Sequence, residues 1–313
     1  MSTDNQRNRK KVIAVGGAKG GIGKSIFATN LALLLSSVGK TVIIDLDLGG
    51  ANLHLYLGET SLRWNINDFL NRKVPTLQEA LVQSRYGLQL LGGDSSQLGS
   101  ANIHSSLKLK LLKAIQQIDA DYIILDLGGD TSYNMLDFFL ASDCGIVLTT
   151  CDPASYLDAY NFIKVSLFRK LNLLLGSNSQ DIISKNSALK KIVHEATLSR
   201  NGSRVKTINE LLKRIHETHP HDLPIISKAV SGFTPYLVIN RVRDERSAEP
   251  IISRIQEVSK RVLSIEVKHA GNLGYLEEIE DSARDLIPVM VKHPQGRLSQ
   301  EIRHIARNIL KKQ

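Results

Sequence analysis

The chain has 313 residues, of which 42% are hydrophobic and 23% charged, and its formal net charge is +9. This composition argues against disorder, because enough apolar residues are present to build one large α/β domain or two smaller ones. The N-terminus, MSTDNQRNRKK, lacks the apolar core of a signal peptide, and no apolar run reaches membrane-spanning length, so a cytoplasmic protein is expected. Cys144 and Cys151 do not form a C-x-x-C pair and are expected to be ordinary buried thiols.

Positive charge is concentrated in two segments of the chain. Residues 161–220 hold eleven Lys and Arg against four acidic residues, and residues 297–313 hold five against Glu301 alone. The rest of the chain is slightly negative. Each basic segment is either a solvated face or a surface for an anionic partner, such as nucleic acid, anionic lipid or an acidic protein.

Apolar runs and helical patterns alternate from the start of the chain. Strands are expected at residues 11–15, 41–47, 88–93, 121–127, 144–150 and 235–241. Most of these runs are continuously apolar, which is typical of strands buried on both faces of a parallel sheet, and helical patterns such as 25–40 and 104–118 lie between them. The alternation predicts an α/β fold with a doubly wound, mostly parallel sheet, whose ligands bind at the carboxyl ends of the strands.

A segment without any strand pattern interrupts this order. Several helical patterns follow one another there, whereas a plain crossover between parallel strands needs only one helix. We therefore expect a basic helical insertion at residues 170–230, within a single domain that spans residues 1–313.

Residues 18–25, AKGGIGKS, fit the phosphate-binding loop G-x-x-x-x-G-K-[S/T], with Ala18 at the first glycine position. The glycines let backbone N–H groups turn inward around a phosphate, Lys24 brings positive charge to its oxygens, and the Ser25 hydroxyl is a ligand for Mg²⁺. An expected strand precedes the loop and an expected helix follows it, which is the context that this motif requires. The sequence therefore predicts a nucleotide site.

Carboxylates stand at the ends of two expected strands and should meet at the same edge of the sheet. Asp126 follows four apolar residues, where a carboxylate can organise Mg²⁺ through its water shell. Asp45 and Asp47 follow the run TVII, and a carboxylate there can orient the water that hydrolysis requires. Capping of a helix or turn is the other interpretation of Asp45 and Asp47.

The complete pattern of residues 19–25, KGGIGKS, resembles the deviant phosphate loop of the MinD/ParA ATPases. That family accepts various residues at the position of Ala18. In the family, the first lysine of the loop reaches across a homodimer that encloses the nucleotides, and the resemblance assigns this role to Lys19. It implies ATP and Mg²⁺ as cofactors, a homodimer on ATP binding, and hydrolysis that depends on dimerisation.

Further segments extend the resemblance over most of the chain outside the insertion. DLDLGGANLHLYLG resembles the first switch of the family, with Asp47 positioning water and Asn52 at the nucleotide. TCDPASYLDAYNFIK places Asp152 at the nucleotide across the dimer, and VINRVR places Asn240 and Arg241 at adenine. DLGGDTSYNMLDFFLASD is most similar to the second switch of the FlhG/FleN subgroup, which regulates the number and position of flagella.

The resemblance and the motifs together define an expected site. The catalytic residues are Lys19, Lys24 and Asp47. The nucleotide is expected to contact Gly20, Gly21, Ile22, Gly23, Lys24, Ser25, Ile26, Asn52, Asp152, Asn240 and Arg241. Mg²⁺ is expected to be held by Ser25 and, through water, by Asp126 and Asp45.

Two features depart from the family pattern. Asp130 stands where the second switch usually has a glycine, so its carboxylate either repels the γ-phosphate, slows hydrolysis or points away, and a hinge glycine is lost. Residues 297–313 carry an apolar stripe with basic residues largely off it, the pattern of a membrane-surface helix. The position of this segment matches the last core helix of the family, so core packing is favoured and membrane contact is the alternative.

The features predict an ATP-dependent dimerising switch that recruits a protein partner and regulates flagella or other cell-surface machinery, in the cytoplasm or at the inner face of the membrane. ParA-like DNA segregation, with DNA on the basic insertion, is the alternative, and it predicts binding that weakens steeply with salt. An iron–sulfur carrier would need paired cysteines, which the sequence lacks. A metabolic ligase or kinase would need a substrate pocket that the sequence does not identify.

Overall fold

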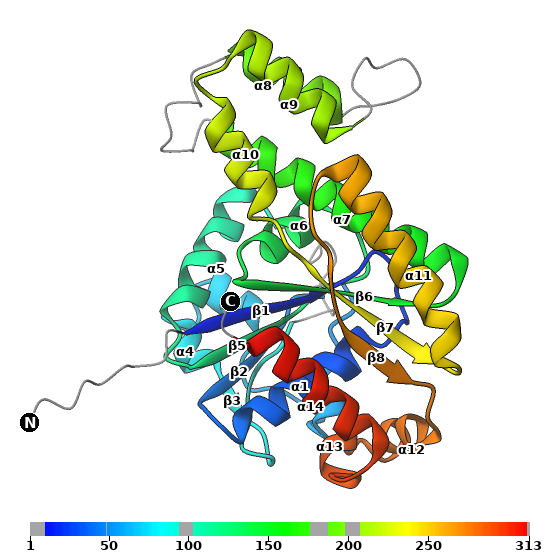
Figure 1. Cartoon of the computed structure of the whole chain (residues 1–313). Coiled ribbons are helices and arrows are strands. Elements are labelled where there is room, and N and C mark those ends of the chain that lie inside the picture. Colours follow the sequence, from blue (N-terminus) through cyan, green and yellow to red (C-terminus); the bar gives the residue numbers. More distant parts are fainter. Residues whose placement is uncertain (1–9, 48, 94–102, 176–186, 198–206, 312–313) are drawn as a thin grey trace, which may run out of the picture.

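The computed structural model describes residues 10–47, 49–93, 103–175, 187–197 and 207–311. Within these ranges the chain forms an eight-stranded sheet in the order β3-β4-β2-β5-β1-β6-β7-β8 (Figure 1). The strands are β1 (Lys11–Gly16), β2 (Thr41–Asp45), β3 (Val82–Gln83), β4 (Gln89–Leu91), β5 (Tyr122–Asp126), β6 (Cys144–Thr150), β7 (Tyr236–Val242) and β8 (Lys268–Gly274). All neighbours pair in parallel except β3 and β4. The predicted α/β fold with a mostly parallel sheet is confirmed.

Each of the six expected strands is present, and two further strands were missed. The edge strand β8 has the sequence KHAGNLG, whose glycines, asparagine and charged residue have low strand propensity. It is a strand because it pairs with β7, and the pairing register shifts between Leu237 and Val238, opposite Gly271. Pairing with β7, and not the propensity of its own residues, therefore makes β8 a strand. Strand β3 was missed because its two residues are too few for a periodic signal.

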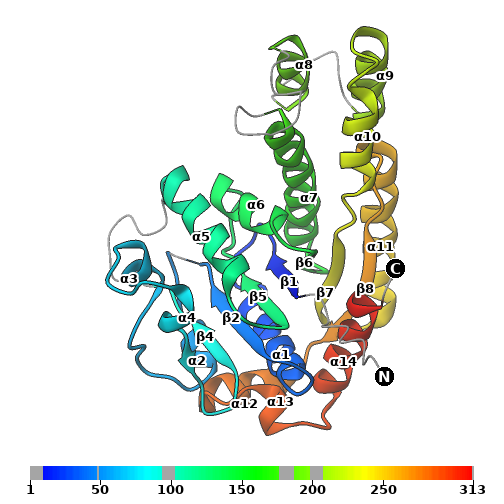
Figure 2. The same ribbon diagram turned by 90° about the vertical axis from the view of Figure 1, so that its left-hand side faces the viewer.

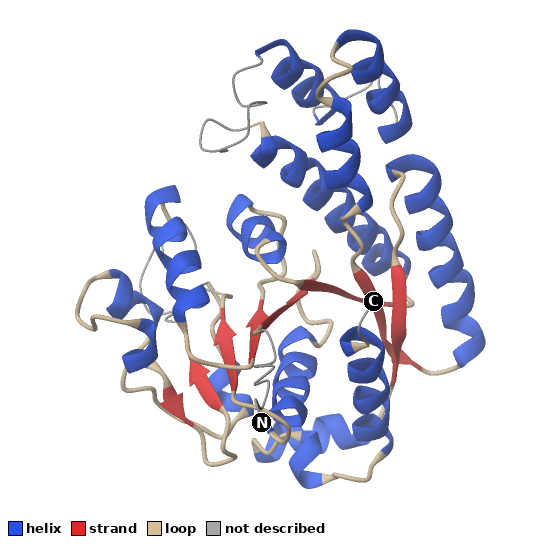
Figure 3. Cartoon of the chain, turned by 60° about the vertical axis from the view of Figure 1, so that its left-hand side comes forward, coloured by secondary structure: helices blue, strands red, loops and turns tan. Residues whose placement is uncertain are grey.

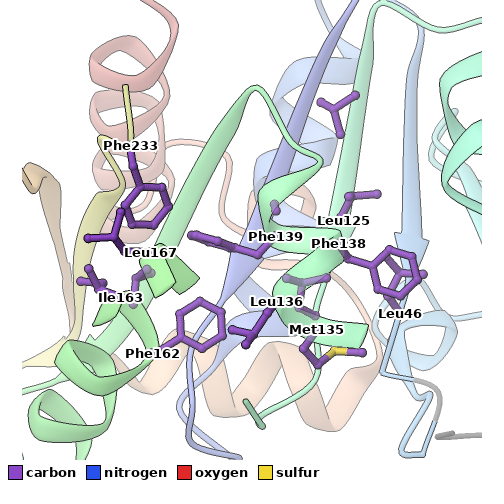
Figure 4. Packing of buried hydrophobic residues seen from close by; sticks show 14 of the residues in the cluster. Leu46, Leu125, Met135, Leu136, Phe138, Phe139, Phe162, Ile163, Leu167 and Phe233 are labelled. Carbon is purple, nitrogen blue, oxygen red and sulfur yellow. The ribbon is translucent and has the colours of Figure 1, made fainter. Parts of the chain in front are cut away.

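Helices cover both faces of the sheet (Figure 3). They are α1 (Lys24–Ser36), α2 (Leu53–Tyr56), α3 (Ile66–Leu70), α4 (Leu77–Ala80), α5 (Ser105–Gln117), α6 (Tyr133–Leu140), α7 (Pro153–Leu174), α8 (Ser187–Thr197), α9 (Ile208–Thr218), α10 (Leu223–Ser231), α11 (Glu245–Val258), the π-helix η2 (Ser259–Leu263), α12 (Glu277–Asp285), α13 (Val289–Lys292) and α14 (Arg297–Leu310). On one face, α6 and α7 pack with Phe139 and Phe162 edge to face, their ring centroids 5.0 Å apart (Figure 4). On the other face, α1 and α14 pack against the strands.

The described parts of the segment expected as an insertion consist of helices and short turns, with no strand. It contains the end of α7 and the helices α8, α9 and α10, while residues 176–186 and 198–206 lie outside the described ranges. These three helices stand together beyond the end of the sheet (Figures 1 and 2). Their apolar residues, such as Leu189, Leu211 and Ile226, are fully buried, so we refer to α8–α10 as the helical arm.

The sequence left open whether the last helix, α14, packs in the core or contacts a membrane. The members of its apolar stripe, including Leu298, Ile302, Ile305 and Ile309, are buried against the sheet and α1. The stripe therefore belongs to the core, as favoured, and offers no free apolar face to a membrane. None of the helices in the described ranges has the length and apolar character that spanning a bilayer requires.

Candidate functional site

The loop between β1 and α1 has the backbone of a phosphate-binding loop. Gly21 and Gly23 adopt left-handed conformations, with φ of 72° and 93°. A Cβ on Gly23 would lie 2.5 Å from the amide nitrogen of Asn240, so no larger residue fits there. Helix α1 begins at Lys24 without a side-chain cap, which leaves the N–H groups of its first turn available to an anion.

Lys24 is buried beneath this loop, with 7% of its surface exposed. Its Nζ donates to the backbone carbonyl of Lys19 at 2.9 Å, which holds the loop closed around the ammonium group. Burial lowers the pKa of Lys24, and the nearby charges of Asp126, Asp47 and Asp130 act in the opposite direction. The ammonium group thus stands among carboxylates, where a phosphate would reach it.

Asp45 and Asp126 face each other across neighbouring strands β2 and β5, and each is 1% exposed. Asp45 accepts backbone hydrogen bonds from Asp47 and Leu53, both at 3.1 Å, and burial raises its pKa to about 7. The pKa of Asp126 is well above its usual range because of burial and the adjacent charge of Asp45.

The electrostatics of Asp126 fit a divalent cation. Its Oδ1 has no hydrogen-bond partner within the described residues although it is completely buried, and the Ser25 hydroxyl bonds the carboxyl group. A buried carboxylate with an unused acceptor is costly unless a cation compensates it. Ser25 and Asp126 together therefore form a suitable place for Mg²⁺ and its water shell.

The raised pKa of Asp126 leads to a pH-dependent prediction. A carboxyl group whose folded-state pKa is raised lowers stability at every pH above its unfolded-state value of about 4. Asp126→Asn should therefore raise the melting temperature of the nucleotide-free and metal-free protein near pH 8, and the gain should vanish as the pH falls to about 4. Thermal melts across this range test the prediction, with the exposed Asp130→Asn as control. A gain that is independent of pH would contradict it.

The second switch packs directly on the phosphate loop, and the first switch packs on the second. A Cβ on Gly129 would lie 2.7 Å from the backbone nitrogen of Gly20, so the second switch touches the loop backbone to backbone. Asp47 lies two residues beyond the end of β2 and is half-buried, and its Oδ1 would be 3.2 Å from a Cβ on Gly128. A group bound in the loop would therefore move the second switch directly and the first switch through the contact of Asp47 with Gly128.

Asp130, the departure in the second switch, has a local structural role. Its Oδ1 accepts a hydrogen bond from the backbone N–H of Ser132 at 2.6 Å, and Ser132 in turn caps α6. The side chain is exposed. Asp130 therefore stabilises the turn that leads into α6, which accounts for a carboxylate at this position.

Lys19 has a partner that sequence reasoning did not anticipate. Its Nζ lies 2.7 Å from Oδ2 of Asp152, at the start of α7, and the two side chains are 39% and 53% exposed. The hydrogen bond from Lys19 lowers the pKa of Asp152. Within one chain, the two residues assigned to the dimer interface are thus paired with each other, and this exposed pair is weak enough to be exchanged.

The side chains of Asn240 and Arg241 donate hydrogen bonds to the backbone of the phosphate loop. The Asn240 amide donates to the carbonyl of Ile22 at 2.7 Å, its oxygen accepts from the N–H of Arg241, and the Arg241 guanidinium donates to the carbonyl of Gly21 at 2.8 Å. Apart from the bond between these two residues, these hydrogen bonds go to the loop backbone. Asn52 lies at the start of α2 with its side chain exposed.

A pocket of about 310 Å³ adjoins this part of the loop. Its walls are mostly apolar and include Ile26, Phe27 and Leu273, with Tyr275 and Glu280 at its polar side. Its size and lining suit a nucleoside beside the phosphate site. The sequence patterns did not reveal Tyr275 and Glu280, because they lie at least 250 residues beyond the loop and only the fold brings them to it.

Alternative metal chemistry finds no support in the described residues. No group of three or more His, Cys, Asp or Glu side chains there could hold a metal ion. Cys144 is buried in β6, and burial raises its pKa to about 12. Cys151 is only half-buried, so the expectation that both thiols are buried is wrong for Cys151.

Fold and site together define a P-loop nucleotide-binding protein. Residues 8–187, more than half of the chain, match the ParA family model described as NUBPL iron-transfer P-loop NTPase, and the chain therefore belongs to the ParA/MinD family of P-loop NTPases. The resemblance found in KGGIGKS is thereby confirmed.

Two curated relatives are linked to flagella by name. The chain is 35% identical over 178 residues to the flagellum site-determining protein YlxH of Helicobacter pylori, a match that covers 56% of this chain and 60% of that protein. It is 31% identical over 159 residues to the antiactivator FleN of Pseudomonas aeruginosa, which covers 50% of this chain and 56% of FleN. The matches thus span less than two thirds of these relatives.

A solved structure shows the same fold over almost the whole chain. MinD of Pyrococcus horikoshii, in complex with Mg-ADP, superposes with a TM-score of 0.63 at 18% identity, covering 96% of each chain.

Proposed function

We propose that this protein is an ATP-dependent dimerising switch that hydrolyses ATP. The observation that carries the proposal is the position of Lys19. This lysine lies partly exposed at the rim of a complete phosphate loop, in an ion pair with Asp152 that another subunit can exchange. An ATP dimer would free Lys19 from Asp152 and direct it to the phosphates of the other subunit.

Each residue of the site has a separate role in binding and hydrolysis. The loop N–H groups and Lys24 bind the β- and γ-phosphates. Ser25 and Asp126 would hold Mg²⁺, and the ion would supply positive charge to the phosphates. Asp45 fixes the start of the first switch through its bonds to Asp47 and Leu53. The carboxylate of Asp47, at the meeting point of both switches, orients the attacking water. Loss of the γ-phosphate then releases the second switch, which packs directly on the loop, and with it the first switch, because Asp47 packs against Gly128.

The biological process that fits best is control of the number or position of flagella. The names of the two relatives, YlxH and FleN, support this reading. The ATP-bound dimer would bind a protein partner and release it after hydrolysis. ParA-like DNA segregation is the alternative, and the few aromatic side chains of the arm do not favour stacking on single strands.

Light scattering with ATP and with ADP, alongside the ATPase rate, tests the proposal. Wild type and Asp47→Ala should dimerise with ATP and remain monomeric with ADP. Lys19→Ala should dimerise weakly, and both variants should lose most of their turnover, by about a hundredfold. Lys40→Ala, which removes an exposed lysine paired with Asp119, is the matched control and should behave as wild type. A wild type that stays monomeric with ATP would refute the dimer, whatever its affinity for nucleotide.

A further inference from the structure

A broad groove of about 920 Å³ lies at the end of the sheet opposite the phosphate loop. Tyr236 and Lys268, the first residues of β7 and β8, line it, whereas Asn240 near the other end of β7 contacts the phosphate loop. Parallel strands carry the nucleotide at their carboxyl ends. A ligand in this groove would therefore not touch the nucleotide site.

The groove is strongly basic. Lys260, Lys268 and Lys311 line it together with His269, and Glu266 is its only acidic residue among the described lining positions. None of the three lysines forms an ion pair with a carboxylate of the described residues. Lys260 and Lys311 are exposed, and Lys268 is half-buried. Uncompensated positive charge in a concave surface attracts an anionic partner.

One side of the groove is formed by unusual backbone. The π-helix η2 forms one wall, and π-helical turns are rare and frequent at functional sites. Ser264, directly after it, has a left-handed φ of 56°, and its hydroxyl donates to Asn209 of α9 at 2.7 Å. The groove thus lies where the helical arm joins the sheet, and a partner bound there would contact both.

The floor of the groove is suited to a polypeptide. Ile265 and Val267 are buried beneath it, so its base is apolar. Two lining amides are fixed by bonds to backbone carbonyls, Gln256 to Val267 at 2.9 Å and Asn308 to Ala270 at 2.8 Å. Polar amides and lysines in one groove suit the backbone and carboxylate groups of an acidic chain.

We propose that this groove binds an extended, acidic segment of a protein partner. Its concave form and apolar base favour a peptide over a membrane surface, and the single aromatic residue in its lining, Tyr236, does not favour stacking with nucleic-acid bases. The groove is far from the Lys19–Asp152 pair and from Lys24. Partner binding here would therefore leave the nucleotide site and the proposed ATP dimer intact.

Fluorescence anisotropy with short synthetic peptides tests the proposal on the full chain. The probes are a peptide rich in Asp and Glu, and matched peptides with Asn and Gln or with Lys at the same positions. Only the acidic peptide should bind, and increasing salt should weaken it. The triple variant Lys260→Glu, Lys268→Glu, Lys311→Glu should lose about tenfold or more in affinity. The control Lys40→Glu, Lys73→Glu, Lys113→Glu makes the same charge change on exposed positions outside the groove and the helical arm, and it should bind as wild type.

A milder variant and two other anionic probes complete the experiment. The milder Lys→Gln triple variant at the same groove positions replaces the Glu variant if that one melts early, and it should also weaken the acidic peptide. Equal binding by groove and control variants would overturn the proposal. It would also be overturned if anionic lipid vesicles or duplex DNA bound more tightly than the peptide and required the groove lysines. Titration with fluorescent ATP separates this result from the proposed function, since the groove variants should bind ATP as wild type does.

Discussion

Lys24→Met is expected to remove measurable ATP binding. Lys24 is the buried ammonium group beneath the loop, with Asp126, Asp47 and Asp130 as its charged neighbours. Its loss would take away the charge that meets the phosphates and would leave the buried carboxylates to repel them. Several charge-assisted hydrogen bonds are lost together, so the affinity should fall by about a hundredfold or more.

Titration of the Mg²⁺-containing protein with a fluorescent ATP analogue measures this loss. Lys40→Met is the matched control, because it removes an exposed lysine from a surface ion pair and should leave the affinity unchanged. If Lys24→Met binds within about threefold of wild type, the phosphates do not lie in the loop. The nucleotide site would then have to be placed elsewhere.

Asp137→Ala is expected to destabilise the fold more than any surface change. Asp137 on α6 is 7% exposed and accepts from Arg169 of α7 at 2.6 and 2.9 Å and from the buried Lys108 of α5. Burial acts to raise its pKa, but the bonds from Arg169 and Lys108 outweigh burial and hold the pKa below its usual range. The variant would strand a buried lysine, at a cost of about 3–5 kcal/mol in the free energy of unfolding.

Urea unfolding and thermal melts at neutral pH measure this cost. The double variant Lys108→Met, Asp137→Leu should recover much of the loss, because it removes the buried lysine charge as well as its partner. Asp119→Ala, which breaks an exposed pair with Lys40, should change stability by less than about 1 kcal/mol. A loss below about 1 kcal/mol for Asp137→Ala would show that Lys108 and Arg169 find other partners.

The Asp137 cluster also ties the switch to the rest of the protein. Asp137 lies on α6, which directly follows the second switch, and Arg169 lies on α7, which begins next to Asp152. The Arg169 guanidinium also stacks on Tyr133, the first residue of α6, at 4.5 Å. Helix α7 is therefore held at one end through Asp152 and Lys19 and farther along through Asp137, and at its other end it packs against the helical arm.

Local sequence patterns were sufficient to predict most of the strands and the phosphate loop. Continuous apolar runs identified β1, β2, β4, β5, β6 and β7, and KGGIGKS identified the phosphate loop. The reason is that a strand buried on both faces needs an unbroken apolar run, and a loop that wraps a phosphate needs glycines at fixed spacing. The adjacent Lys24 and Ser25 at the end of the loop, and Asp45 and Asp126 at the ends of strands, were identified from the same local patterns.

Tertiary structure decided the contacts between distant segments. Only the fold pairs Lys19 with Asp152, brings Asn240 to the carbonyl of Ile22, and buries the stripe of α14. The edge strand β8 exists because β7 supplies its partner, against the propensity of its own residues. The basic groove likewise gathers residues from α9, η2, β8 and α14. Spacing along the chain carries no information on such pairs, because their energy comes from burial, hydrogen bonds and charge that arise only when the segments meet.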